Sequence, residues 1–487
     1  MKTRSPRSKI TFVFKLLKTA LPDHTSSSPP NLKKHNLHMI ITEKELQTKR
    51  IAPLFKAYFF PTLFSMISIS LITIADGFFV GRGVGADGVA AVNIVWAPTM
   101  IFVGLGLMLG IGCGVTSTIA LSQGNKMAAR RHVTQAMTLG LIIITILATI
   151  MLVNPQKTVM LLGASDTLKD ITIEYMLYLI PGFVIDILCL IGQFALRCDG
   201  RPKTAMWSTL LPGLMNVALD WLFVFRLDMG IKGAALAASL SFVVGAFIVV
   251  FALLNPKSKL RLLNIFSKHT WVGVTRNISR QCLIGLSALL GELVMAMTMF
   301  LGNISTMRLL GDAGVGAFGV VCYYLPFIFL LGNAIAQSGQ PILSFNYGRK
   351  NTVRVRETFH YMVKTAIVCG LICAFAFFFL NTALTSFFIP TNSPAGIIAI
   401  EAFPYYAACA LPYIFNIVAT GYFQSIERAK PSIVFALMRG TVFLIPSFIL
   451  LPLWLGSTGV WLALTVSELS TTLFIVLFYT QRRIKRK

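Results

Sequence analysis

Residues 200–239 read GRPKTAMWSTLLPGLMNVALDWLFVFRLDMGIKGAALAAS. Most of this stretch is apolar, but an amide, Asn216, and a carboxylate, Asp220, lie four residues apart inside it. On a helix this spacing places both side chains on one face. A carboxylate near the centre of a membrane-spanning helix costs at least ~2.5 kcal/mol, so such residues usually serve a function. We therefore interpret the segment as a membrane helix whose polar face binds an ion.

The composition is that of a membrane protein. The 487 residues are 55% hydrophobic and 13% charged, with a mean hydropathy of +0.74, whereas an ordinary soluble domain has ~25% charged residues. The formal net charge of +25 raises the question of a nucleic-acid partner. Lys and Arg occur in short clusters between apolar runs, however, and form no single basic face. We expect a lipid bilayer around this chain and no nucleic acid.

From residue 51 onward, twelve apolar runs are each long enough to cross ~30 Å of hydrocarbon. None of them alternates in polarity as a barrel strand would, so we expect helices. The predicted fold class is all-α integral membrane. The runs are 53–80, 90–119, 133–153, 171–196, 204–226, 232–254, 281–307, 315–340, 360–386, 396–422, 431–453 and 457–480.

Basic residues divide the loops into two sets. Both tails, the segment 255–280 and every second loop are rich in Lys and Arg, and the loops between them are nearly neutral. By the positive-inside rule, both termini are cytoplasmic. We expect a basic tail that is disordered at its start, with Met39 as an alternative start of the chain, then two lobes joined by a linker, and a second basic tail. The boundaries are 1–50, 51–254, 255–280, 281–480 and 481–487.

The two halves of the chain repeat at an offset of about 226 residues. GADGVAA at 85–91 matches GDAGVGA at 311–317, and GIKGAALA at 230–237 matches GSTGVWLA at 456–463. Six helices followed by six helices in the same orientation predict two lobes related by a pseudo-two-fold axis along the membrane normal. Such two-lobed chains bind their substrate in the cleft between the lobes.

Signatures of enzymes and cofactor sites are missing from the sequence. The eight cysteines include no CxxC pair, and no histidine lies deep in an apolar run, so we expect neither a metal site nor a disulfide framework. Gly83, Gly85 and Gly88 satisfy G-x-G-x-x-G, but they follow a spanning helix rather than a strand. There is no Walker loop and no interfacial cluster of catalytic residues. We expect a protein that is not an enzyme and binds no cofactor other than a coupling ion.

Five acids lie well inside the apolar runs: Asp76, Asp186, Asp220, Glu292 and Glu468. Asp76 is about four residues from the outer end of its run and Asp220 about six, so at 1.5 Å per residue the two lie at matching depths. No base lies deep within these two helices. A carboxyl group buried without a counter-charge readily takes up and releases a proton. The alternative is that both acids only form hydrogen bonds that shape the lobe.

Glu292 lies near the middle of the seventh run, in SALLGELVMAMTMFLGN. Met and Phe adapt to varied apolar ligands, so an acid among them indicates a binding surface for organic cations. The alternative is an ion pair with Arg439, the one base deep in an apolar run. The sequence leaves these two interpretations open, and it assigns no role to Asp186 or Glu468.

Several of these stretches resemble the multidrug and toxic compound extrusion (MATE) family. The resemblance covers most of residues 41–483, and the proton-coupled prokaryotic branch is the most similar. It rests on ADGFFVG at 75–81, LRCDGRPK at 196–203, NVALD at 216–220, GELVMAMTMFLGN at 291–303 and GQPILSFNYGR at 339–349.

The resemblance implies roles for five residues. Asp76, Asn216 and Asp220 match an ion-coupling site in the N-terminal lobe of the family, and Ser239 matches a hydroxyl that joins it. Glu292 matches the family's seventh-helix glutamate, which is a substrate-binding residue. The long basic N-terminus and Asp186 depart from the family pattern.

The expected function is an antiporter that exports cationic or amphipathic drugs and toxic compounds across the bacterial inner membrane by alternating access. It would exchange them for H⁺ or Na⁺, and we expect it to act as a monomer. The alternative is a lipid-linked oligosaccharide flippase of the same superfamily. A flippase is expected to line its cleft with several cations, whereas Arg439 is the one deep base that the sequence identifies.

Overall fold

The computed structural model describes residues 40–484. Over these residues the chain folds into helices and the turns between them, with no β-strand. The all-α fold class predicted from the sequence is confirmed. The start of the basic tail, for which we predicted disorder, lies outside the described residues.

The first half of the chain forms six long helices. Lipid offers no partner to backbone N–H and C=O groups, so the apolar segments satisfy them internally as helices. They are α3 (Ile51–Gly83), α4 (Ala86–Ser122), α5 (Lys126–Val153), α7 (Lys169–Cys198), α8 (Pro202–Asp220), which continues through the π-helical turn η1 (Trp221–Arg226), and α9 (Gly230–Leu254). Two short helices, α2 (Glu43–Thr48) and α6 (Pro155–Leu161), accompany them.

The second half forms a matching set. It contains α10 (Val274–Cys322), α11 (Leu325–Gly348), α12 (Thr352–Phe379), α14 (Pro394–Ser425), α15 (Ala429–Leu437), which continues through the π-helical turn η3 (Met438–Val442) and α16 (Leu444–Leu455), and α17 (Ser457–Ile484). The short elements are η2 (Lys268–Trp271) and α13 (Asn381–Ser386). The linker predicted at 255–280 ends earlier than expected, because α10 begins at Val274.

Eleven helical stretches of the described chain are long and apolar enough to cross a membrane, and one of them, 274–348, runs for 75 residues through α10 and α11. At 1.5 Å per residue this stretch is more than twice the length that a bilayer needs. Gly311 interrupts it with φ 60° and ψ −155°, a conformation that a residue with a Cβ rarely adopts. The stretch therefore supplies two spans, and residues 40–484 contain the twelve that the sequence predicted.

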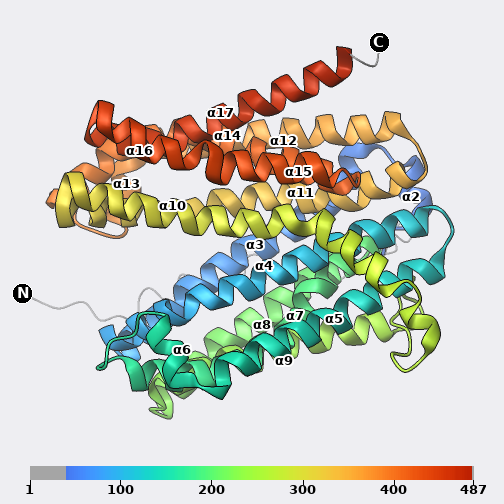
Figure 1. Ribbon diagram of the computed structural model, residues 1–487, viewed down its shortest axis with the longest axis horizontal. Coiled ribbons are helices and arrows are strands. Elements are labelled where there is room, and N and C mark those ends of the chain that lie inside the picture. The colour runs from blue at the N-terminus through green and yellow to red at the C-terminus, as the bar shows by residue number, and fades with distance from the viewer. Residues whose placement is uncertain (1–39, 485–487) are drawn as a thin grey trace, which may run out of the picture. The chain divides into compact units, whose positions relative to one another are not determined.

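The helices form two lobes with separate hydrophobic cores. One core is built from α4, α5, α7, α8 and α9, and the other from α10 to α17. Figure 1 shows α12, α14 and α17 on one side, α5 to α9 on the other, and α3, α4, α10 and α11 between them. Helices of the two lobes meet where α4 packs against α10 and α11.

Helix α3 belongs to both lobes. Its first half, with Leu54, Phe55 and Tyr58, is part of the core formed by α10 to α17. Its second half packs on α8, where the Ile72 side chain fills the space beside Gly213. Pro61 lies inside the helix and leaves one backbone carbonyl without its usual donor. A bend of α3 would therefore move one lobe relative to the other.

Contacts between the lobes concentrate toward the basic-loop end of the helices. A Cβ on Gly285 of α10 would lie 2.6 Å from the carbonyl carbon of Met108 in α4, so glycine allows the two backbones to touch. At the end of the helices, Arg349 Nη1 donates a hydrogen bond to the Ser122 carbonyl (3.1 Å). The cleft between the lobes is thus closed at this end.

The segment 40–50 bridges the two lobes at the same end. The Ile41 N–H donates to the Gly200 carbonyl in the turn between α7 and α8 (2.7 Å). On the other side, Arg354 Nη2 of α12 donates to the carbonyls of Leu46 (3.1 Å) and Lys49 (2.8 Å). These contacts hold α2 across the closed end of the cleft.

Candidate functional site

Asp76 and Asp220 lie next to each other in the N-terminal lobe, as the family resemblance implied, and their depths match as the sequence predicted. Asp220 is fully buried, Asp76 is half-buried, and neither Asp220 oxygen has a hydrogen-bond partner in the described chain. No ion pair reaches either acid within residues 40–484. Burying an isolated carboxylate is costly, and binding a proton or a small cation removes most of that cost. The arrangement is suited to reversible ion binding.

Local backbone structure brings the two acids together. Asp220 is the last α-helical residue of α8, and the wider π-helical turn η1 begins immediately after it. π-helical turns are rare and often occur at functional sites. Beyond Asp220, Val224 of η1 packs on Gly83 of α3, so the second half of α3 lies close along α8 and η1. This packing holds Asp76 opposite Asp220.

Two further side chains lie near the acids. Asn216, one turn before Asp220, is buried, and its Nδ2 finds no hydrogen-bond partner among the described residues. Tyr175 of α7 is also buried and lies close enough to interact with both carboxyl groups. The sequence analysis identified Asn216 but missed Tyr175.

Ser239 of α9 is placed differently. Its hydroxyl donates to the backbone carbonyl of Tyr178 in α7 (2.6 Å). No hydrogen bond of the described chain joins it to Asp76, Asn216 or Asp220. In this structure Ser239 fastens α9 to α7, and its part in an ion-coupling site stays a prediction.

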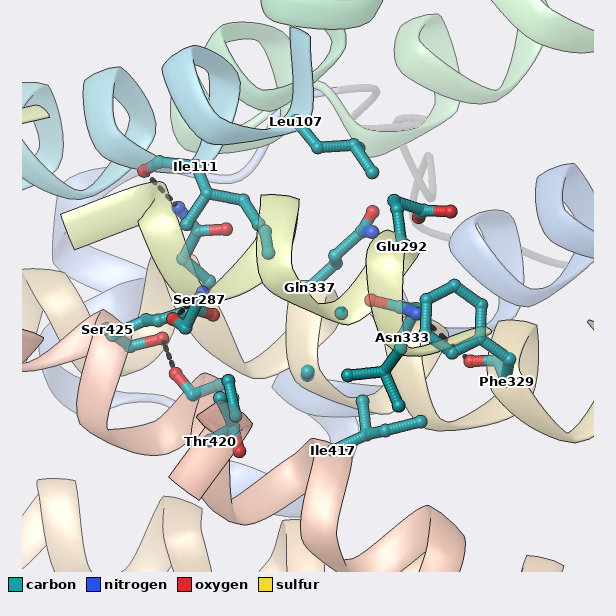
Figure 2. Close-up of a pocket in the computed structure, with 18 of the residues that line it drawn as sticks. Leu107, Ile111, Ser287, Glu292, Phe329, Asn333, Gln337, Ile417, Thr420 and Ser425 are labelled. Carbon is teal, nitrogen blue, oxygen red and sulfur yellow. Dashed lines mark hydrogen bonds between the residues drawn. The ribbon is translucent and has the colours of Figure 1, made fainter. Parts of the chain in front are cut away.

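A cavity between the lobes contains Glu292. The empty space inside it, together with the open space at its mouth, is about 690 Å³. In Figure 2, Glu292 of α10 lines it together with Asn333 and Gln337 of α11 and Leu107 of α4. No ion pair reaches Glu292 from any described residue. The cavity thus presents an unpaired acid among apolar and amide side chains.

Arg439 does not neutralise Glu292. Its Nε donates to Glu468 Oε1 at 2.5 Å, and both side chains are buried. The second Glu468 oxygen accepts a hydrogen bond from Asn416 Nδ2 (2.7 Å). The alternative of an ion pair between Glu292 and Arg439 is therefore wrong, and Glu468 has a structural partner.

Arg197 is a buried cation that lies just beyond the predicted run 171–196, at the start of one of the basic loops. It is 2% exposed at the end of α7 and donates to Gln337 Oε1 of the other lobe (2.9 Å) and to Gln193 Oε1 (3.2 Å). A helical stripe of polar residues at 175, 186, 193 and 197 of α7 was the signal that could have revealed it. Asp186 is half-buried on this stripe, and no described residue pairs with it.

Comparison with known proteins decides the family. The sequence model of the MatE family matches residues 61–222 and 288–449, one segment in each half of the chain. The chain belongs to the MatE family. The matched segments also agree with the internal repeat that the sequence showed.

Similar proteins include other transporters. This MatE chain is 23% identical over 436 residues to the FAD transporter of Shewanella oneidensis, covering 87% of this chain and 93% of the relative. It is 23% identical over 430 residues to the multidrug export protein MepA of Staphylococcus aureus, covering 86% and 91% of the two chains.

Solved MATE structures share the fold. A MOP superfamily transporter from Pyrococcus furiosus superimposes with a TM-score of 0.83 at 22% identity, covering 91% of this chain and 98% of the other. A mutant of the Vibrio cholerae MATE transporter VcmN gives a TM-score of 0.83 at 18% identity, with the same coverage. These likenesses confirm the predicted two-lobed fold of twelve membrane helices.

Proposed function

We propose that this MatE protein is an ion-driven antiporter that exports cationic or amphipathic compounds across the bacterial inner membrane. The observation that supports this most directly is the presence of two separate unpaired acid sites, Asp76 with Asp220 in one lobe and Glu292 in the cavity between the lobes. Two such sites suit antiport, because ion binding at one can be linked to substrate binding at the other by a coupling free energy. The names of its relatives, a multidrug export protein and an FAD transporter, support small organic molecules as substrates.

Helix α3 supplies a physical connection between the two sites. Asp76 lies in the half of α3 that packs on α8, and the other half is part of the second lobe's core. Ion binding at Asp76 and Asp220 would change the packing of α3 against α8, and Pro61 allows the helix to bend between its halves. An ion that binds one arrangement more tightly shifts the population toward it.

The direct test is drug accumulation in cells that lack their native efflux pumps. Expression of this chain should lower the steady-state content of a cationic dye, and the effect should disappear with an uncoupler or, for Na⁺ coupling, without sodium. Accumulation that is unchanged by expression would contradict export. Movement of lipid-linked oligosaccharide in place of drugs would favour the flippase.

The proposed orientation predicts that the loops at Gln123 and Lys350 face the cytoplasm. Both residues are exposed in turns between helices and adjoin basic clusters. In a cysteine-free background, cysteines at these positions should react with a membrane-impermeant maleimide only after permeabilisation. Labelling of either cysteine in intact cells would contradict the proposed orientation and favour the opposite one. A cysteine in the neutral loop at Asp166, which is exposed in the loop between α6 and α7, serves as the outward control.

Glu292→Gln should selectively weaken the binding of cationic substrates. Hydrogen bonds to charged groups contribute roughly 1.5–3 kcal/mol, so the affinity for a cationic dye should fall about tenfold or more, and that for a neutral analogue should change little. Binding to purified protein measures both. Glu174→Gln removes a surface acid whose ion pair with Lys232 is 3.7 Å long, and it controls for net charge. Equal losses for cationic and neutral compounds would assign Glu292 a structural role.

A further inference from the structure

Arg439 presents an unused hydrogen-bond donor at the wall of the substrate cavity. The residue is one of those that line the cavity, it is 6% exposed, and it lies in the π-helical turn η3. Its Nη2 atom is buried, and no atom of the described chain accepts a hydrogen bond from it. A buried donor without an acceptor is destabilising, and more so when it is charged.

The surrounding side chains hold the guanidinium in place. Nε is bound to Glu468, whose other oxygen is occupied by Asn416. The guanidinium carbon lies 4.1 Å from the centre of the Tyr413 ring, within the range of cation–π attraction. Neither oxygen of Glu468 accepts a hydrogen bond from Nη2 in this structure. The guanidinium is therefore fixed in position, charged, and only partly used.

Among the described residues, no other group of the cavity satisfies this donor. Within residues 40–484, Glu292 is the one acid that lines the cavity. It forms no ion pair with Arg439. The two are on adjoining elements, since Val294 of α10 packs on Gly440 of η3. The cavity thus holds an unpaired carboxyl group and an unfilled guanidinium N–H as two separate charged groups among apolar, hydroxyl and amide side chains.

We propose that Arg439 forms an oxyanion subsite and that the preferred substrates are zwitterions, with an amine bound by Glu292 and a carboxylate or phosphate bound by Arg439. The inference rests on the proposed function and extends it to a substrate class. A planar guanidinium forms its strongest hydrogen bonds with such oxygen acids. A compound with both charges would satisfy both charged groups of the cavity, whereas a simple cation would satisfy Glu292 alone.

The test compares three dyes on the full-length protein in nanodiscs. One is an aminoxanthene cation with a free benzoate, the second is its methyl ester, and the third carries a phosphonate in place of the benzoate. Fluorescence polarisation without any ion gradient should show the benzoate dye binding about tenfold or more tightly than the ester. Tighter binding of the ester would overturn the proposal. The phosphonate dye separates the two oxyanions: stronger binding than the benzoate identifies phosphate compounds as the substrates.

The matched variant is Arg439→Met with Glu468→Met. Removing both partners avoids leaving a buried unpaired charge, which would destabilise the lobe. The double variant should lose the preference for the benzoate dye and bind the ester as the wild type does. Unchanged preference, or equal losses for both dyes, would contradict the subsite.

Arg439→Lys provides a second measurement that keeps the bond to Glu468. Lysine retains the positive charge but lacks the second edge of the guanidinium. Benzoate binding should fall by about tenfold and ester binding should be unchanged; the same affinities as wild type would overturn the assignment. Because these measurements use no gradient, failure of ion-driven export would be detected separately in the accumulation assay.

Discussion

Asp220→Asn should reduce gradient-driven export to the level of cells without the transporter. Asparagine has nearly the same shape as the protonated aspartic acid, but it cannot gain or lose a proton or bind Na⁺ with a full charge. The wild-type side chain is fully buried with both oxygens unpaired. The substitution therefore adds no buried charge, and the protein should fold. Efflux from everted vesicles with an imposed pH or sodium gradient measures the effect.

Substrate binding should survive the same substitution. The cavity that contains Glu292 is lined by α4, α10, α11, α14, α15 and the turn η3, which carries Arg439, and none of these elements contains Asp220. Affinity for a cationic dye should thus stay within about twofold of wild type while transport is lost, because distant sites usually behave independently to within ~0.5 kcal/mol. Asp76→Asn should behave in the same way. Full gradient-driven efflux in both variants would exclude this pair as the coupling site and make Glu292 the candidate.

Sequence reasoning could predict the helices and the acid pair because both depend on local patterns. Apolar runs of sufficient length predict the membrane spans. The four-residue spacing of Asn216 and Asp220 predicts that they share one helix face. The depth of Asp76 in its run put it level with Asp220, and the family resemblance implied that the two share a site. These features require only the helix rise and the thickness of the bilayer.

Other features depend on contacts between distant segments, which no local pattern contains. From the sequence alone, Arg439 could have paired with Glu292 or with Glu468. In the structure α17 packs on η3, and this contact brings Glu468 to Arg439. Arg197 looked like one more residue of a basic loop, but α11 covers it. The hydroxyl of Ser239 is bound to a backbone carbonyl of α7, a kind of partner that side-chain motifs do not reveal.

A bulky residue at Gly285 should trap the transporter with its basic-loop end open. In the closed arrangement a Cβ at this position would lie 2.7 Å from the Met108 Cα as well as against its carbonyl, and backbone atoms cannot turn away as a flexible side chain does. Overpacking of this kind typically costs ~1–3 kcal/mol. A side chain as large as leucine should destabilise the closed arrangement by more than this. Each lobe keeps its own core, so Gly285→Leu should fold.

The measurement is the reactivity of a cysteine that the closed lobes cover. Ile111 of α4 is 6% exposed and belongs to the small interlobe cluster with Ile284. In a cysteine-free background, Ile111→Cys should react slowly alone and at least ~10-fold faster together with Gly285→Leu, because a change of about 1.4 kcal/mol shifts a two-state population tenfold. Dye efflux should fall in parallel, since a transporter held in one state cannot complete its cycle.

Gly319→Leu is the matched control, because a Cβ at Gly319, also in α10, meets no atom within 4 Å. It should leave both the reactivity of the cysteine and the efflux close to wild type. If Gly285→Leu behaved like this control, the contact between α4 and α10 would not be one that opens during transport. If instead Gly285→Leu abolished efflux without exposing Ile111, closure would be strained but intact. Faster labelling with lost efflux is the combination that alternating access requires, since the substitution acts only on the state in which the two backbones touch.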